Sequence, residues 1–220
     1  MKPNNIILEG ITGSKAYGLD TETSDEDIKG IFVVPTVDVL GIKGYPETKD
    51  HVDPDWCYHE VGKFIQLAMK GNPTILELLF LDGYTVLEKF GKMLVDNRHL
   101  FLNNVIRHSY GGYALSQARK LNARGGTYGN GRNKRFAKHS RHCLRLLYQG
   151  AELLQTGNLT VRVTKEMREE IFAFGEMPVN EVVNIFEKKF KEFDLIESVL
   201  PDKPDIDKIN NLLIKIRKGN

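Results

Sequence analysis

The sequence predicts an α+β fold, in which strands and helices share the first hundred residues and helices fill the remainder. Two apolar runs rich in β-branched residues, at 5–11 and 27–34, are bounded by Gly or Pro in the manner of buried strands. From about residue 85 onward, apolar residues recur mostly at helical spacing. We therefore expect an α/β domain at residues 1–98 and a helical domain at residues 99–220 packed against it.

The elements that follow the second strand are punctuated by proline and glycine. Pro35 ends that strand, and Pro73 suits the first turn of a helix, where its missing N–H costs nothing. Downstream of Pro35, the pattern predicts a loop at 36–54 with a candidate strand at 37–42, a strand at 55–58, and helices at 59–70 and 74–80.

The second half is mainly helical. The periodicity predicts helices near 86–94, 107–121, 134–156, 165–173, 180–199 and 205–217. Residues 158–163 alternate like a strand or a hairpin arm. Residues 122–133 form a glycine-rich polar segment, which predicts a mobile loop that orders on a ligand, with Tyr128 as a candidate contact.

Charge is distributed unevenly along a chain whose formal net charge is +2. Residues 101–151 contain ten Lys and Arg and no Asp or Glu, so they should present a positive field to an anion. No apolar run approaches the roughly 20 residues of a membrane helix. Only two cysteines occur, and Glu9 interrupts the first apolar run, which argues against a disulfide framework and a signal peptide. We expect a soluble cytoplasmic protein.

A carboxylate pair before the second strand gives the sharpest chemical signal. Asp25 and Asp27 are two residues apart, so strand alternation places both side chains on one face. Neighbouring carboxylates repel each other unless a cation lies between them, and hard oxygen ligands favour Mg²⁺ or Mn²⁺. Upstream, Gly13 and Ser14 follow the first strand, where backbone amides and a hydroxyl can bind phosphate oxygens. The alternative is a solvated acidic turn, with Ser24 as a helix N-cap.

The order of these motifs resembles that of the DNA polymerase β superfamily of nucleotidyltransferases. The similarity is greatest to a bacterial and phage branch of predicted nucleotidyltransferases that includes RNA-repair-associated members. It is carried by GSKAYGLDTETSDEDIKGIFVVP at 13–35, YHEVGKFIQLAMKGNPTILELLF at 58–80 and KHSRHCLRLLYQGAELLQTGNLTVR at 138–162. The resemblance implies a mixed sheet with helices, two bound Mg²⁺ or Mn²⁺ ions, and Asp25 and Asp27 as metal ligands.

The same resemblance implies a third metal-binding carboxylate on a later strand. Asp55 is the candidate, because it starts the short strand before the helix at 59–70. Asp53 and Glu60 are competing candidates. Asp55 also fits an ordinary turn, since Asp-Pro-Asp is a common turn composition.

The helix predicted at 134–156 carries a row of nitrogen donors. Projected at 100° per residue, Lys138, His142, Arg145 and Gln149 lie nearly opposite its apolar face. No carboxylate precedes Glu152 on this helix, so the salt bridges of an ordinary surface helix are missing. We expect the first three residues to bind a nucleotide triphosphate; nucleic-acid phosphates and a plain solvated face are the alternatives.

Together these features predict a nucleotidyltransferase with its active site in a cleft between the two domains. It would transfer a nucleoside monophosphate from an NTP, gripped by Gly13 and Ser14, to an acceptor hydroxyl. An RNA 3′ end, a protein hydroxyl and a small molecule remain open as acceptors. Two other function classes also remain open: a non-catalytic module that binds nucleotide or nucleic acid, and an antitoxin-like interaction protein.

Overall fold

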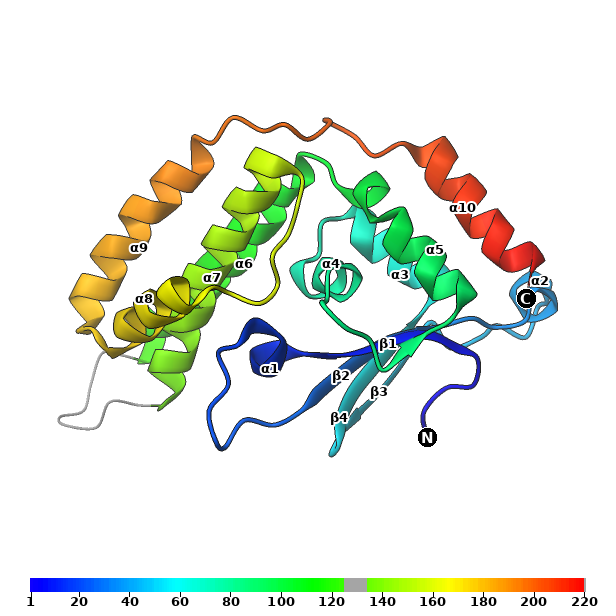
Figure 1. Cartoon of the computed structure of the whole chain (residues 1–220), viewed down its shortest axis with the longest axis horizontal. Helices are drawn as coiled ribbons and strands as arrows, with labels where there is room; N and C mark the ends of the chain where they lie inside the picture. Colours follow the sequence, from blue (N-terminus) through cyan, green and yellow to red (C-terminus); the bar gives the residue numbers. More distant parts are fainter. Residues whose placement is uncertain (125–133, 220) are drawn as a thin grey trace. The chain divides into compact units, whose positions relative to one another are not determined.

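The computed structural model describes the backbone of residues 1–124 and 134–219, and their side chains except within 120–135. The chain divides into two compact units (Figure 1), Met1–Asn103 with Lys203–Asn220, and Asn104–Asp202. A mixed five-stranded sheet with helices forms the first unit and helices form the second, which confirms the predicted α+β class. These units differ from the predicted domains at 1–98 and 99–220 in two respects, because the first unit extends to Asn103 and also contains residues 203–220.

The sheet of the first unit has the strand order β3-β4-β2-β1-β5. Its strands are β1 (Ile6–Thr12), β2 (Asp27–Phe32), β3 (Thr48–Val52), β4 (Asp55–Glu60) and β5 (Val86–Leu87). β2 and β4 run parallel, whereas the other neighbouring pairs are antiparallel. The strands predicted at 5–11, 27–34 and 55–58 are thus confirmed, with small shifts at their ends.

Two segments of this unit differ from the prediction. Residues 37–42 do not form a strand, because helix α2 (Thr36–Leu40) begins after Pro35. The Asp38 N–H donates to the Pro35 carbonyl at 2.9 Å, closing a turn that a strand cannot contain. Conversely, β3 lies in the predicted loop. It is a mostly exposed edge strand whose residues lack the apolar alternation by which strands are recognised.

The remaining helices of the first unit are α1 (Gly13–Tyr17), α3 (Val61–Met69), α4 (Pro73–Leu79), α5 (Lys89–Asp96), the 3₁₀ helix η1 (Arg98–Phe101) and α10 (Ile206–Lys218). Pro73 occupies the first turn of α4 as predicted, and the Asn72 side chain accepts the Thr74 N–H at 3.1 Å. Figure 1 shows α3, α4 and α5 on one side of the sheet.

The two faces of the sheet differ in their covering. Leu8 and Ile31 are fully buried on the face toward α4, where a Cβ built on Gly10 would lie 3.7 Å from Leu78. We call this the helix face. The opposite face carries an aromatic cluster of Phe32, Trp56 and Tyr58, with Ile6, Ile28 and Val34 packed against it. Side chains at alternate positions of each strand therefore enter different surroundings.

A buried ion pair fixes α10 to the first unit. The Arg217 guanidinium lies 2.6 Å from the fully buried Glu60 carboxylate, and Thr36 Oγ1 donates to the Arg217 carbonyl at 2.6 Å. Glu60 also accepts the Gly62 N–H at 2.8 Å, which caps the N-terminus of α3. These contacts explain why the last helix groups with the sheet rather than with the helices that precede it in sequence.

The second unit is built from α6 (Val105–Arg124), α7 (Lys134–Thr156), α8 (Lys165–Glu176) and α9 (Val179–Asp194). Arg107 of α6 donates to the carbonyls of Phe193 at 3.0 Å and Asp194 at 2.6 Å, satisfying acceptors at the end of α9. No helix in the described part of the chain has the length and apolar character needed to cross a membrane.

The strand predicted at 158–163 is wrong. These residues are irregular, although Leu159, Val161 and Val163 are buried with the expected alternation. The Gln149 amide of α7 donates to the carbonyls of Thr160 and Val161, both at 3.2 Å, so a side chain provides the hydrogen bonds that a neighbouring strand would. The loop segment with Tyr128 lies outside the described residues.

Candidate functional site

One edge of the sheet brings together the end of β1 and the beginnings of β2 and β4. Thr12, the last residue of β1, pairs with Asp27, the first residue of β2. The parallel pairing of β2 with β4 starts at Ile28 and Trp56, so Asp27 and Asp55 each precede the first pair. Because opposite positions of paired strands share a face, the two carboxylates begin neighbouring strands on the same side of the sheet.

Gly13 fits tightly against Asp27. Its φ of +68° lies in the left-handed region, which glycine adopts without strain. A Cβ at this position would overlap the Asp27 carboxylate, with Asp27 Cγ at only 2.9 Å. Thr12 Oγ1 donates to the Asp27 carbonyl at 3.1 Å, which fixes the strand entry from the other side. The Gly13 turn and the Asp27 side chain are therefore packed in direct contact.

Ser14 follows in the first turn of α1. The Leu19 N–H donates to the Ser14 carbonyl at 2.9 Å and closes this short helix. Lys15 pairs with Glu26 at 3.1 Å, which links α1 to the segment that carries Asp25. The Ser24 hydroxyl accepts the Thr21 N–H at 2.9 Å, so Ser24 stabilises a turn and does not cap a helix.

A buried hydrogen bond holds α1 from beneath. Tyr17 Oη donates to Glu77 Oε2 of α4 at 2.6 Å, and both residues are nearly inaccessible to solvent. A hydrogen bond to a charged acceptor contributes about 1.5–3 kcal/mol. This contact connects the turn of Gly13 and Ser14 to the core helices, a link that sequence reasoning missed.

The chemistry of the donor set suits a hard divalent cation. Asp25 and Asp55 are exposed and Asp27 is half-buried, so carboxylate oxygens are available along this edge. Within the described residues, however, no three Asp, Glu, His or Cys side chains converge into a metal-binding group. Carboxylate oxygen is the ligand type that Mg²⁺ and Mn²⁺ prefer. The donors therefore match such a cation in type, and a shared site requires their side chains to move together.

The competing third carboxylates occupy different surroundings. Glu60 lies at the far end of β4, fully buried, in the ion pair with Arg217 described above. Asp53 is exposed in the turn before β4, and its N–H donates to His51 Nδ1 at 3.2 Å. Asp55 is the member of this group that adjoins the first pair of β2 and β4.

Further along the same face, β4 carries Cys57 and His59. Their side chains are 3.7 Å apart, and Thr48 Oγ1 lies 2.9 Å from His59 Nδ1. Burial lowers the pKa of His59, and the positive charges of Lys29 and Lys63 lower it further. Burial also raises the pKa of the Cys57 thiol, which keeps it protonated and poorly nucleophilic.

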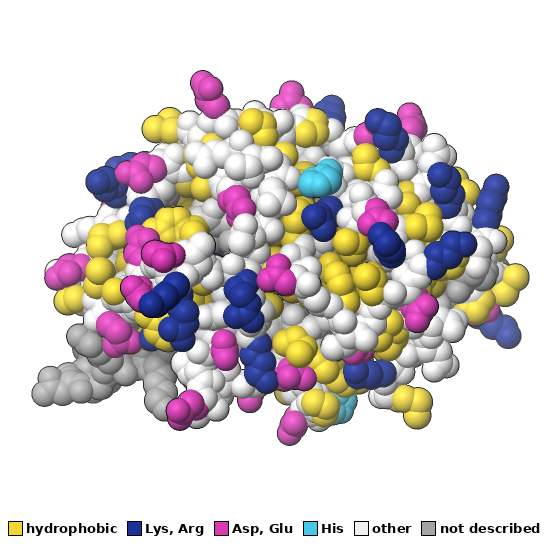
Figure 2. All heavy atoms as spheres, in the orientation of Figure 1, with side chains coloured by type: hydrophobic (Ala, Val, Ile, Leu, Met, Phe, Trp, Pro, Cys, Tyr) yellow, Lys and Arg dark blue, Asp and Glu magenta, His cyan; other side chains and the backbone are white. Residues whose placement is uncertain are grey.

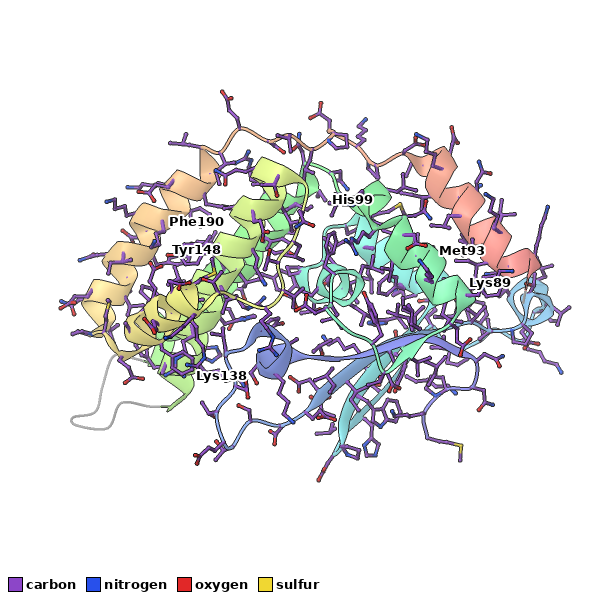
Figure 3. All side chains as sticks on the ribbon, viewed as in Figure 1. Lys89, Met93, His99, Lys138, Tyr148 and Phe190 are labelled. Atoms are coloured by element: carbon purple, nitrogen blue, oxygen red, sulfur yellow. The ribbon has the colours of Figure 1, made fainter. Side chains whose placement is uncertain are left out.

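The predicted donor row of α7 is divided by burial. Lys138 is exposed near the start of α7 (Figure 3), whereas Arg145 and Gln149 are buried. Arg145 donates to Gln149 Oε1, and its other terminal nitrogen lies 3.0 Å from His142 Nδ1. The helical projection did not reveal this, because residues 158–163 cover the polar side of α7 and engage Gln149.

Several charges of the basic segment are engaged within the second unit. Arg107 binds α9 carbonyls, and Arg141 pairs with Glu176 at 2.9 Å and stacks over the Phe172 ring at 4.0 Å. Figure 2 shows basic and acidic side chains interspersed over the visible face. The predicted positive field is thus reduced by local partners at these positions.

Comparison with known proteins identifies a family. A sequence model described as RlaP, RNA repair pathway DNA polymerase beta family, matches residues 1–189. The chain is also similar to an uncharacterized 38.9 kDa protein encoded in the nrdC-mobD intergenic region of Enterobacteria phage T4. The two are 30% identical over 54% of this chain and 39% of the phage protein. The chain thus spans well under half the length of that relative.

Proposed function

Because the chain belongs to the RNA repair pathway DNA polymerase beta family, we propose that it transfers a nucleoside monophosphate from an NTP to an acceptor hydroxyl. The observation that carries the proposal is the packing of Gly13 against Asp27, at the edge where Asp55 also begins its strand. This packing supports the proposal, because a turn that could approach phosphate lies beside carboxylates that could hold cations. The family description favours an RNA 3′ end as the acceptor.

The reaction assigns a task to each group. The acceptor oxygen forms a bond to the α-phosphorus, the bond to the bridging oxygen breaks, and pyrophosphate leaves. Asp25, Asp27 and Asp55 would hold the divalent cations, two in number, which would stabilise negative charge on the phosphates. One of these carboxylates accepts the hydroxyl proton. Backbone amides at Gly13 and the Ser14 hydroxyl orient the phosphates.

Helix α7 of the second unit carries the other residues proposed to bind phosphate. Lys138, exposed near the start of α7, would bind a phosphate oxygen directly. His142 and Arg145 are hydrogen-bonded to each other, and Arg145 is buried, so we assign Arg145 to orienting His142. Which NTP is used is decided by experiment.

A direct assay tests the proposal. Each of the four α-labelled NTPs is incubated with the protein, Mg²⁺ or Mn²⁺, and separate pools of RNA, DNA and protein. Transfer of label to RNA supports the preferred acceptor. Label on protein or DNA assigns a different acceptor and overturns the RNA assignment. Absence of label from every pool, together with salt-dependent binding that needs no divalent ion, would identify a non-catalytic binding module.

Matched variants locate the carboxylates. Asp27→Asn and Asp55→Asn should each reduce transfer at least about a hundredfold, or ~2.7 kcal/mol at the barrier. Asp53→Asn, two residues from Asp55 in an exposed turn, is the control and should cost less than about tenfold. Greater sensitivity at Asp53 would transfer the third-ligand role to that residue.

A further inference from the structure

Lys29 lies on the same face of the sheet as the candidate carboxylates. It pairs with Gly10 of β1 and with Cys57 of β4, and it follows Asp27 by two residues in β2. Alternation therefore directs its side chain to the helix face, one repeat of roughly 7 Å along the strand from Asp27. On β4, Asp55 precedes Cys57 by the same repeat. Lys29 is thus the nearest cationic position of β2 to the proposed site.

Lys29 is half-buried as a residue, and its ammonium has no ion-pair partner among the described residues. Among the described residues, no carboxylate oxygen lies within ion-pair distance of it. Other lysines of the same unit do have such partners: Lys15 pairs with Glu26 and Lys63 with Glu47, both at 3.1 Å. The positive charge of Lys29 contributes to the lowered pKa of His59 on the neighbouring strand β4.

We propose that the Lys29 ammonium binds a phosphate oxygen of the nucleoside triphosphate. This rests on the proposed function, in which Asp27 and Asp55 hold the cations that the phosphates also bind. Asp27 and Lys29 are one strand repeat apart on the same face, so a phosphate bound near Asp27 would be within reach of the long lysine side chain. A compact ammonium suits such an oxygen.

Equilibrium binding in the absence of acceptor tests the proposal. Each of the four NTPs is titrated with Mg²⁺ into the wild type, Lys29→Met and Lys29→Arg, and the tightest-binding NTP is compared. Lys29→Met should weaken binding at least about tenfold, or 1.4 kcal/mol. Lys29→Arg, which keeps the charge, should recover most of the loss. The control is Lys49→Met, because Lys49 pairs with Tyr58 and projects from the opposite face; its affinity should change less than about twofold.

The outcomes separate this inference from the function beneath it. If Asp27→Asn abolishes NTP binding while Lys29→Met binds as tightly as the wild type, the inference is overturned and the function stands. In the transfer assay described above, an effect of Lys29→Met confined to the KM for the acceptor would also overturn it. If the wild type binds no NTP, the proposed function fails, and the inference with it. Should Lys29→Met fold poorly, judged by its fluorescence, Lys29→Gln gives the same comparison with a polar side chain.

Discussion

Replacing Gly13 by Ala tests whether the turn and the Asp27 carboxylate form one packed unit. The left-handed φ of +68° makes any side chain at this position costly, by about 1–2 kcal/mol. The added Cβ would also lie 2.9 Å from Asp27 Cγ and 3.3 Å from Asp27 Cβ, closer than packed atoms tolerate. Overpacking of this kind typically costs a further 1–3 kcal/mol, at the order-of-magnitude level.

Gly44 provides a matched control. Its φ is +69°, but a Cβ built there would meet no atom within 4 Å. Gly44→Ala should therefore incur the backbone cost alone, and the change in unfolded-state entropy is the same for both variants. The difference between the two variants, about 1–3 kcal/mol, isolates the contact with Asp27. Adding Asp27→Ala to Gly13→Ala should recover part of that difference.

The assay is urea unfolding followed by tryptophan fluorescence. Trp56 is the only tryptophan in the sequence and lies in β4, so its emission reports on the unit that contains both glycines. Binding of Mg²⁺-NTP measured on the same samples should weaken with Gly13→Ala and remain unchanged with Gly44→Ala. Equal destabilisation by the two substitutions, with NTP binding intact in both, would refute the packing argument.

Three further predictions follow from buried groups. Glu60→Gln should destabilise the first unit by about 3–5 kcal/mol in the Trp56-monitored unfolding assay, because it leaves the Arg217 charge uncompensated; full stability would contradict a structural role. Burial holds the pKa of His59 below 6.5, so the neutral ring stabilises the fold above pH 6.5 and this contribution is lost as the pH falls below that value. His59→Gln should therefore flatten the acid side of the profile of unfolding free energy against pH, and an unchanged profile would contradict this. In circular dichroism melts, Arg145→Ala should lower the free energy of unfolding by about 2–5 kcal/mol, whereas Lys138→Ala should change it by no more than about 0.5 kcal/mol. The reverse order would mean that Arg145 is not buried.

The parts of the fold that could be predicted were those with strong local patterns. β1 and β2 are apolar runs between glycine and proline, and α4 carries a proline at its start, so their positions followed from the sequence. β3 could not be found this way, because an exposed polar edge strand is specified by its neighbour β4 rather than by its own residues. The same is true of residues 158–163, whose apolar alternation reflects burial beneath α7 without a strand partner.

The candidate site could be predicted only in part. Gly13, Asp25 and Asp27 lie within fifteen residues of one another in the sequence, and the structure adds the packing of Gly13 against Asp27. Sequence reasoning missed Lys29, and the structure shows that it shares a face with Asp27 and has no ion-pair partner among the described residues. The burial of Arg145 was not predictable from a helical projection, because a projection contains one helix and burial depends on what covers it.

The segments at which the chain enters and leaves the second unit are hydrogen-bonded to each other. The Asn104 N–H donates to the Pro201 carbonyl at 2.9 Å, and its side-chain amide donates to Asp202 at 2.7 Å. The second unit is therefore an insertion with adjacent ends, between Asn103 and Lys203 of the first. During synthesis the second unit is made before α10, so it can fold before the ion pair between Glu60 and Arg217 forms. The first unit therefore begins before the second but is completed after it. A translation product that stops before α10 would contain a folded second unit and a first unit that lacks its last helix.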